Sequence, residues 1–393
     1  MKRKNLITLI VLISVVLLAE LLFLGYMAFR EGHGDPLLNQ QTTPTETDPP
    51  QTVPATEETL VTEPVETTEA TEPTETEPPE TEPPQPESFL LTFAGDCTFG
   101  GTPAREEIET GFLKVVGDNF DYPFQNVRTY FENDDYTLIN LEQAMGDKGY
   151  PADKKWTFRG PAKYTQVMTG SSVEFVTIAN NHSHDFGNEA YENTREILEE
   201  AGIAYTESYK SVTVTTERGL TIAIYAVDAS LSAMNKAQMV ADITALKESG
   251  VDVIVAAFHW GYENIYQSNP AQREMGKAAI DAGANIVWGH HPHVLQPIEE
   301  YNGGIIYYSL GNFAFGGNSV PKDLDTAILQ QEIIREPDGT IHLGELTIIP
   351  CSVSSIKERN NFQPTPYEEG SEEYNRVLAK LNGTFTGPNL PIG

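Results

Sequence analysis

The sequence contains few cysteines and few basic residues, and both shortages narrow what the protein can be. Only two of its 393 residues are cysteines, Cys97 and Cys351, so an ordinary hydrophobic core rather than a disulfide scaffold must stabilise the chain. The sequence is compatible with a disulfide between them outside the cell and equally with two buried thiols. Lys and Arg number 25 against 57 Asp and Glu, for a formal net charge of −32. Because nucleic-acid binding needs a basic surface, we expect no nucleic acid as a partner.

Charged residues are almost missing from residues 6–29, which follow a basic stretch at residues 2–4. At ~1.5 Å per residue this apolar run is long enough to cross a membrane, even with Glu20 inside it. A cleaved signal peptide is the alternative, although no small-x-small cleavage site follows the run. We expect residues 1–32 to be a cytoplasmic tip and a transmembrane anchor. Because the basic residues precede the helix, the predicted protein is single-pass in the cell membrane, with its N-terminus cytoplasmic and its remainder extracellular.

Basic residues are absent from residues 33–88, a segment rich in Thr, Glu and Pro with fourteen acidic residues. Such a segment has too little apolar surface to offset its ordering entropy, and proline and like-charge repulsion keep it extended. We therefore expect a disordered stalk that holds the following domain away from the membrane.

From residue 89 onward, short apolar runs alternate with longer amphipathic stretches, which is the pattern of an α/β domain. Strands are predicted at 89–94, 136–141, 174–179, 221–227, 251–258, 285–288, 305–310, 327–334 and 341–349. Helices are predicted at 189–201, 237–249 and 271–282. An Asp-Gly turn at 338–339 predicts a hairpin between the last two strands. We expect one domain over 89–362 and a polar C-terminal tail over 363–393 with a helix near 372–381.

Polar residues directly follow five of these predicted strands. They are Asp96; Asn140 and Glu142; Asn181 and His182; His259; and His290, His291 and His293. Because open α/β sheets place ligands at the carboxyl ends of their strands, we expect these residues to meet in one region. Taken singly, an aspartate there is more often a turn residue and a lone histidine more often part of a core. Together, carboxylate, amide and imidazole groups favour a site for one or two divalent ions, with Mn, Fe or Zn preferred.

These motifs make the sequence similar to a known family. The chain resembles the CapA-type capsule proteins, including the PgsA proteins of poly-γ-glutamate synthesis, within the calcineurin-like metallophosphoesterase superfamily. The resemblance rests on residues 94–96, 140–142, 180–187, 259–263, 289–293 and 308–313. It implies a four-layer α/β/β/α sandwich with a metal site at strand ends, behind an N-terminal membrane anchor.

The resemblance also implies roles for individual residues. Asp96 and His293 would ligate one metal ion, and Asn181, His259 and His291 the other. Glu142 would bridge the two ions, and His182 would stabilise or protonate the leaving oxygen. Beyond what the resemblance implies, we expect supporting or substrate-binding roles for Asn140, Asp185, Glu263 and His290, and we expect Arg159 to act as an anion clamp.

The sequence departs from the superfamily pattern at two of these motifs. The first motif usually reads Asp-x-His, but Thr98 occupies the histidine position here, and the second reads Asn140-Leu141-Glu142 rather than Gly-Asp-x-x-Asp. The ion held by Asp96 and His293 therefore loses one of its usual imidazole ligands, so we expect it to bind more weakly. The domain could accordingly work with one ion or with a chemistry other than phosphoester cleavage.

The resemblance predicts a metal-dependent hydrolase or transferase that acts outside the membrane on a cell-surface anionic polymer or its precursor. Poly-γ-glutamate is the polymer that the family suggests. A non-catalytic subunit that binds the polymer during synthesis or export, beside membrane synthase or export subunits, is the alternative from a different class. A phosphodiesterase of wall polymer or nucleotides is a third reading, which rests on superfamily membership alone.

Overall fold

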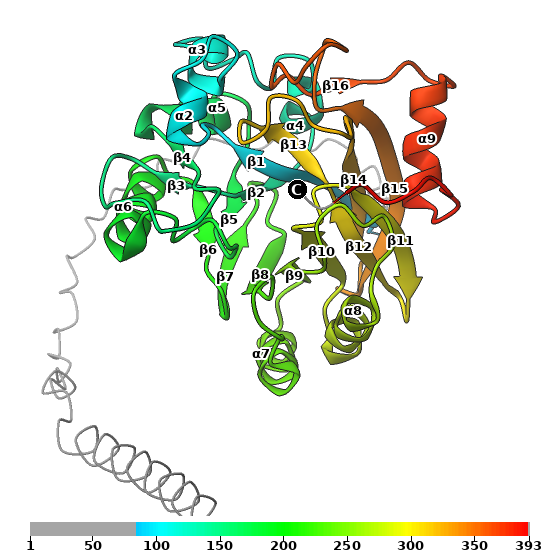
Figure 1. Ribbon diagram of the computed structural model, residues 1–393. Coiled ribbons are helices and arrows are strands. Elements are labelled where there is room, and N and C mark those ends of the chain that lie inside the picture. The colour runs from blue at the N-terminus through cyan, green and yellow to red at the C-terminus, as the bar shows by residue number, and fades with distance from the viewer. Residues whose placement is uncertain (1–83, 392–393) are drawn as a thin grey trace, which may run out of the picture. The chain divides into compact units, whose positions relative to one another are not determined.

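The computed structural model describes residues 84–391 (Figure 1). The predicted anchor and nearly all of the predicted stalk lie outside the described residues. Between residues 84 and 391, no helix combines the length and the apolar character needed to cross a membrane.

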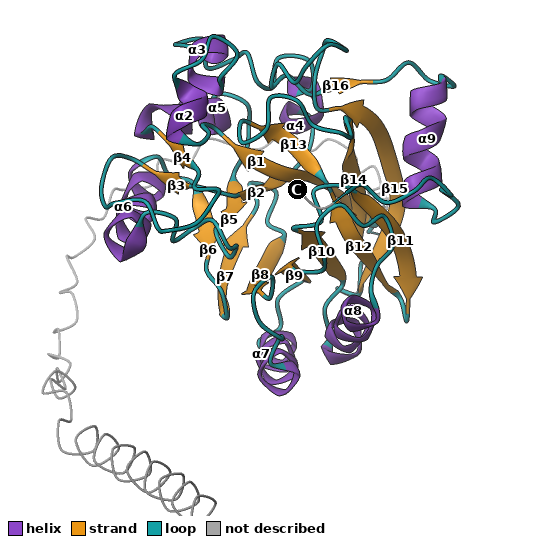
Figure 2. Ribbon diagram, viewed as in Figure 1, coloured by secondary structure: helices purple, strands orange, loops and turns teal. Residues whose placement is uncertain are grey.

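Two mixed β-sheets form the centre of the described domain (Figure 2). The larger sheet has the order β16-β15-β14-β1-β2-β5-β6, with β13 also pairing with β1. Its strands are β1 (Glu87–Thr98), β2 (Tyr136–Leu141), β5 (Phe175–Thr177), β6 (Ala204–Thr206), β13 (Asn312–Phe315), β14 (Asp325–Arg335), β15 (Ile341–Ser352) and β16 (Thr365–Pro366). The smaller sheet has the order β11-β12-β10-β9-β8-β7. Its strands are β7 (Lys210–Thr215), β8 (Thr221–Asp228), β9 (Val253–His259), β10 (Ile286–His290), β11 (Leu295–Tyr301) and β12 (Gly304–Leu310).

Helices cover the outer faces of both sheets, which gives four layers in the order helix, sheet, sheet, helix. The larger sheet packs against α3 (Phe112–Val116), α4 (Arg128–Glu132), α5 (Thr165–Thr169) and α6 (Gly187–Glu200). The smaller sheet packs against α7 (Lys236–Glu248) and α8 (Pro270–Ala282). The short elements α2 (Pro103–Glu106), β3 (Ala144–Met145), β4 (Arg159–Gly160) and a 3-10 turn at Ala162–Tyr164 complete this part of the chain.

The alternation of side chains along a strand explains this layering. In β8, Ile222 and Ile224 face the core between the sheets. Their neighbours Ala223 and Tyr225 face the core beneath α7 and α8. Each sheet therefore has two apolar faces, and each face needs a covering layer.

The predicted C-terminal tail contributes to this core. Its predicted helix is present as α9 (Glu372–Leu381), which begins where the Ser371 side chain accepts a hydrogen bond from the Tyr374 amide. Val377 and Leu381 are buried in the core between the two sheets. Residues 363–393 were predicted to be a polar tail, whereas their helix packs as part of the domain.

The two cysteines are free and buried in the same apolar core. Of the two arrangements that the sequence allowed, the structure has the unbridged pair of thiols. Burial raises the pKa of both the Cys97 and the Cys351 thiol.

Candidate metal centre

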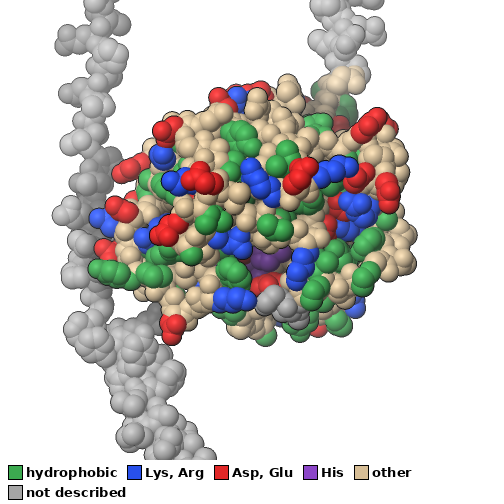
Figure 3. Space-filling model, turned by 45° about the horizontal axis from the view of Figure 1, so that its top comes forward, with side chains coloured by type: hydrophobic (Ala, Val, Ile, Leu, Met, Phe, Trp, Pro, Cys, Tyr) green, Lys and Arg blue, Asp and Glu red, His purple; other side chains and the backbone are tan. Residues whose placement is uncertain are grey.

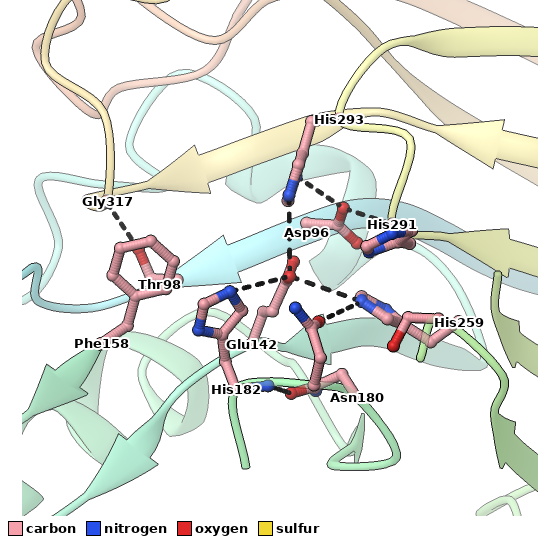
Figure 4. A network of polar contacts seen from close by, with 12 residues as sticks. Asp96, Thr98, Glu142, Phe158, Asn180, His182, His259, His291, His293 and Gly317 are labelled. Carbon is pink, nitrogen blue, oxygen red and sulfur yellow. Dashed lines mark hydrogen bonds and ion pairs between the residues drawn. The ribbon is translucent and has the colours of Figure 1, made fainter. Parts of the chain in front are cut away.

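The strand ends of both sheets deliver polar side chains to one place (Figure 4). In the larger sheet, β1 and β2 run parallel, and Asp96 lies opposite Asn140. In the smaller sheet, β9 and β10 run parallel, and His259 lies opposite His290. Gly95 allows β1 to come this close to the β12–β13 turn, because a Cβ there would lie 2.1 Å from the Gly311 carbonyl oxygen.

Asp96 is a fully buried carboxylate that accepts hydrogen bonds at both oxygens. Its Oδ1 is 2.8 Å from Asn140 Nδ2 and 2.8 Å from His290 Nδ1. Its Oδ2 is 3.3 Å from His293 Nδ1. Burial alone would raise the pKa of Asp96, but the contacts with His290 and His293 outweigh burial and hold the pKa well below its usual value. Asp96 is thus held ionised, as a metal ligand must be.

Glu142 is buried just as fully, but neither of its oxygens accepts a hydrogen bond from any residue in 84–391. Its Oε1 faces three imidazole nitrogens, His259 Nε2 at 3.4 Å, His293 Nε2 at 3.8 Å and His182 Nε2 at 4.0 Å. The buried Nδ1 of His291 also has no hydrogen-bond partner in the described chain. Buried polar groups are normally paired, so these unpaired oxygen and nitrogen atoms, each of which can offer a lone pair, fit a cation that binds among them.

Three groups of side chains bring their ligand atoms within 4.8 Å of one another. They are Glu142, His259 and His291; Asp96, Glu142 and His293; and Glu263, His291 and His293. The first two groups share Glu142, the residue predicted to bridge two ions. Asn181 Oδ1 lies 2.8 Å from His259 Nε2 and extends the first group. Carboxylate, imidazole and amide donors suit a borderline divalent ion such as Mn, Fe or Zn.

Without metal, the raised pKa values of His293 and His259 favour protonated imidazoles at this site. Burial lowers the pKa of His293, but Glu142 and Asp96 prevail and raise it to about 10. The pKa of His259 is also raised, because the charge of Glu142 outweighs burial. By contrast, burial and the neighbouring His259 and His293 hold the pKa of His291 well below its usual value. Positive charge therefore collects next to Glu142, where a metal ion would replace it.

The loop that carries two of these histidines has an unusual backbone. His291 has φ +94° and His293 has φ +56°, both in the region that side-chain-bearing residues seldom adopt. Backbone outliers of this kind cluster at functional sites, where the surrounding structure enforces them. Here the loop between β10 and β11 aims both imidazoles at Glu142.

His182 lies at the edge of the cluster in a fixed orientation. Its Nδ1 is 2.7 Å from Asp185 Oδ2, and its ring packs on Phe158 at an interplanar angle of 34° with centroids 4.3 Å apart. Asp185 is itself fixed by the Phe158 amide, which donates to Oδ2 at 2.6 Å, and by an ion pair with Lys154. The Nε2 of His182 is left facing Glu142, and His182 lines a cavity of about 230 Å³ together with His293 and Glu263.

Most of the residues predicted for the site meet in this cluster, but Arg159 does not. Its guanidinium lies 3.6 Å from the centroid of the Phe186 ring, donates to the Lys148 carbonyl, and lines a different cavity. Phe158 directly precedes β4 and Arg159 is its first residue, and because side chains alternate along an extended chain, Phe158 faces the His182 side and Arg159 does not. The proposed anion clamp is therefore wrong for this site.

Thr98 is also turned away from the cluster. Its hydroxyl oxygen accepts a hydrogen bond from the Gly317 amide at 2.9 Å. The resemblance expects an imidazole at position 98. Thr98 instead holds the loop at Gly317, which lines the cavity.

Some residues that hold the site together were assigned no role from the sequence. Asn312 Oδ1 is 2.9 Å from His293 Nδ1, and Asn180 donates to Asn140 Oδ1 and to the Leu141 carbonyl. Asn312 lies just beyond β12, so the rule that found the other clusters could have found it. No sequence signal identified Lys154 as the partner of Asp185, because both lie in loops.

The match to known proteins agrees with this set of residues. Residues 90–317 match the family model described as bacterial capsule synthesis protein PGA_cap. The chain belongs to this family.

Two known proteins are similar to this chain over most of its length. The PGA biosynthesis protein CapA of Bacillus subtilis (strain 168) is 29% identical over 287 residues, which cover 68% of this chain and 75% of the relative. The capsule biosynthesis protein CapA of Bacillus anthracis is 28% identical over 305 residues, covering 70% and 72%. Among solved structures, the NAD nucleotidase of Haemophilus influenzae aligns with a TM-score of 0.39 at 12% identity, covering 76% of this PGA_cap chain and 56% of that chain.

Proposed function

We propose that this protein is a membrane-anchored, extracytoplasmic, metal-dependent hydrolase of capsule or poly-γ-glutamate biosynthesis. The observation that carries the proposal is the His182–Asp185 pair, which points at the carboxylate that two potential metal-binding groups share. A site that only bound metal would not need an oriented imidazole beside it.

The chain's own residues divide the work of such a reaction. One or two divalent ions would supply Lewis-acid chemistry when bound. The residues that would hold them are Asp96, Glu142, Asn181, His259, His291 and His293. Asp185 accepts the Nδ1 proton of His182, which fixes the tautomer with Nε2 toward the cavity. When His182 is protonated, Nε2 can give its proton to the leaving oxygen as the scissile bond breaks.

Basic side chains at the cavity support an anionic substrate. Arg105 and Lys322 line it, and Lys155 lies over the ring of Trp156, another lining residue. Figure 3 shows histidine at the bottom of a hollow with Lys and Arg side chains around it. Glu263 and Asp323 also line the cavity, so its basic side chains offset nearby acidic ones, and the cavity repels an anionic polymer less than a chain with a net charge of −32 does as a whole.

Arg105, Lys155 and Lys322, here called the basic rim, are also the observation that favours the second candidate. This candidate is a non-catalytic subunit that binds the polymer. Such a subunit would use the metal ions and the rim to hold carboxylates without turnover. His182 separates the two candidates, because only the hydrolase needs a proton donor at that position.

The decisive experiment replaces His182 with alanine in metal-loaded protein. If the protein is a hydrolase, His182→Ala retains the bound metal and lowers turnover of phosphodiesters or γ-linked glutamate polymer by about 10²- to 10⁴-fold. His184→Ala is the matched control, because His184 is exposed and stacks on Tyr191 instead of facing the cavity. Wild-type turnover that is unchanged by His182→Ala would refute the catalytic role.

The membrane topology in the proposal has its own test. Protease added to intact cells should cut within residues 33–88 and release the domain, because that segment is predicted to be extended and outside the membrane. A domain that stays cell-associated and protected from protease would contradict this topology.

A further inference from the structure

The wall of the metal-site cavity includes residues from the end of the chain. Leu390 and Pro391 line the cavity beside His182 and His293. The family match ends at residue 317, so these residues lie outside the part of the chain that the family shares. In Figure 1 the red C-terminal segment runs from α9 back toward the centre of the domain.

Three hydrogen bonds hold the C-terminal segment, residues 384–391, against the loops of the metal centre. The Leu390 amide donates to the Asn264 carbonyl at 3.1 Å. The Tyr266 amide donates to Asn389 Oδ1 at 3.0 Å, and Lys322 Nζ donates to the Pro391 carbonyl at 3.0 Å. Asn264 and Lys322 line the cavity as well, so the C-terminal segment and the cavity loops form one wall.

A buried ion network fixes the start of this segment. Lys380 of α9, whose side chain is only 2% exposed, donates to Asp323 at 2.6 Å and to Asp325 at 2.7 Å. Asp323 also lines the cavity and accepts a hydrogen bond from the Tyr266 hydroxyl at 2.9 Å. Phe385 packs on Tyr266 with ring centroids 4.9 Å apart. One set of contacts therefore ties α9, the C-terminal segment and the cavity together.

We propose that the C-terminal segment restricts access to the metal centre, with Leu390, Pro391 and Lys322 as the residues that set which groups enter. The cavity of about 230 Å³ is small beside the volumes usual for drug-sized ligands. With the wall in place, the site takes a small anionic ester or the end of a chain rather than a bulky internal segment. This statement about substrate size rests on the proposed hydrolase, whereas the restriction of access does not.

The first test measures how fast EDTA removes Mn²⁺ or Zn²⁺ from the loaded full-length protein, over the concentrations at which the rate rises with EDTA. Leu390→Ala/Pro391→Ala trims the wall and leaves every predicted metal ligand intact. A chain ending at Gly383 removes the wall and retains α9. We expect equal initial metal content and removal faster by on the order of threefold or more in both variants.

Leu231→Ala serves as the control, because Leu231 is 83% exposed and does not line this cavity. Its removal rate should equal that of the wild type. If the shortened chain does not fold, the double variant alone decides. Removal rates unchanged in the double variant would overturn the proposal.

The second test compares turnover of a bulky phosphodiester with that of a small one. In the two variants that open the wall, the turnover rate of the bulky ester divided by that of the small ester should rise. Faster metal removal in a protein without any turnover would support the wall and contradict the proposed hydrolase. Turnover with an unchanged removal rate and an unchanged ratio would support the hydrolase and refute the wall.

Discussion

Two clusters of buried charge lie in this domain, and they differ in how their carboxylates are paired. At α9, Asp325 accepts hydrogen bonds from Arg376 at both oxygens, at 2.7 Å each, and from Lys380 at 2.7 Å. At the metal centre, Glu142 is equally inaccessible, yet its oxygens accept no hydrogen bond from residues 84–391. Burial alone therefore does not reveal a carboxylate's role. A fully paired carboxylate holds the fold together, and an unpaired one fits a cation supplied from outside.

The largest effect that we expect comes from breaking the paired cluster. Asp325→Asn leaves the buried ammonium of Lys380 and the guanidinium of Arg376 with less negative charge. The free energy of unfolding should fall by about 3 kcal/mol, the scale for removing one partner of a buried pair. Denaturant unfolding measures this loss, with the exposed Glu369→Gln as the control. A loss no larger than that of the control would show that the cluster does not stabilise the domain.

The next largest effect should come from metal binding at the metal centre, where Glu142 is unpaired. Metal at a hundred times its dissociation constant should raise the free energy of unfolding by about 2.7 kcal/mol. His291→Ala/His293→Ala should abolish this gain and the bound metal, whereas His342→Ala, an exposed histidine on β15, should preserve both. Thermal unfolding with and without Mn²⁺ or Zn²⁺ measures the difference. Full metal content in the double variant would contradict the assignment of His291 and His293 as metal ligands.

A smaller effect should follow from neutralising Glu142 in metal-free protein. Glu142→Gln removes a carboxylate that accepts no hydrogen bond, and His259 and His293 can release their protons in response. We expect the free energy of unfolding to change by less than about 1 kcal/mol, because replacing poorly paired buried charge is often neutral. The same substitution should abolish metal binding. Metal affinity equal to that of the wild type would contradict the bridging position of Glu142.

The last prediction concerns how the stability of the metal-free protein depends on pH. The raised pKa of His293, about 10, stabilises the folded state fully below the unfolded value of ~6.5 and progressively less as pH rises toward 10. The lowered pKa of His291 acts in the opposite sense below ~6.5, so the two partly cancel in acid. Because metal must displace the His293 proton, metal affinity should rise between about pH 6.5 and 10. Calorimetric titration at several pH values tests this, and an affinity that fell over this range would contradict it.

The long elements of the fold were predictable from the sequence, because their apolar residues repeat with the period of a strand or helix. The strand predicted at 136–141 is β2, and the hairpin predicted at 338–339 joins β14 to β15. Short elements such as β3, β4 and α2 were missed, since two to four residues are too few to show a period. The edge strand β7 reads Lys-Ser-Val-Thr-Val-Thr and is half exposed, so its pattern is weak.

The membership of the metal centre was largely predictable, because strand ends bring their polar residues to one edge of a sheet. The direction in which a side chain points was harder to predict. Arg159 and Phe158 are adjacent in sequence, yet only Phe158 faces the histidines. The cavity wall from residues 390–391 was not predictable, because its contacts depend on how α9 packs against distant strands. Metal ligation itself and the membrane anchor stay predictions.

The two buried thiols allow the local opening of the strands around them to be measured in the unmodified protein. Cys97 directly follows Asp96 in β1, and Cys351 lies in β15 at the other side of β14. Neither side chain has measurable solvent exposure, so a thiol-specific reagent can react only after the surrounding strands separate. The mass of each labelled peptide would then report separately how often β1 and β15 open, and bound metal should slow labelling at Cys97 first.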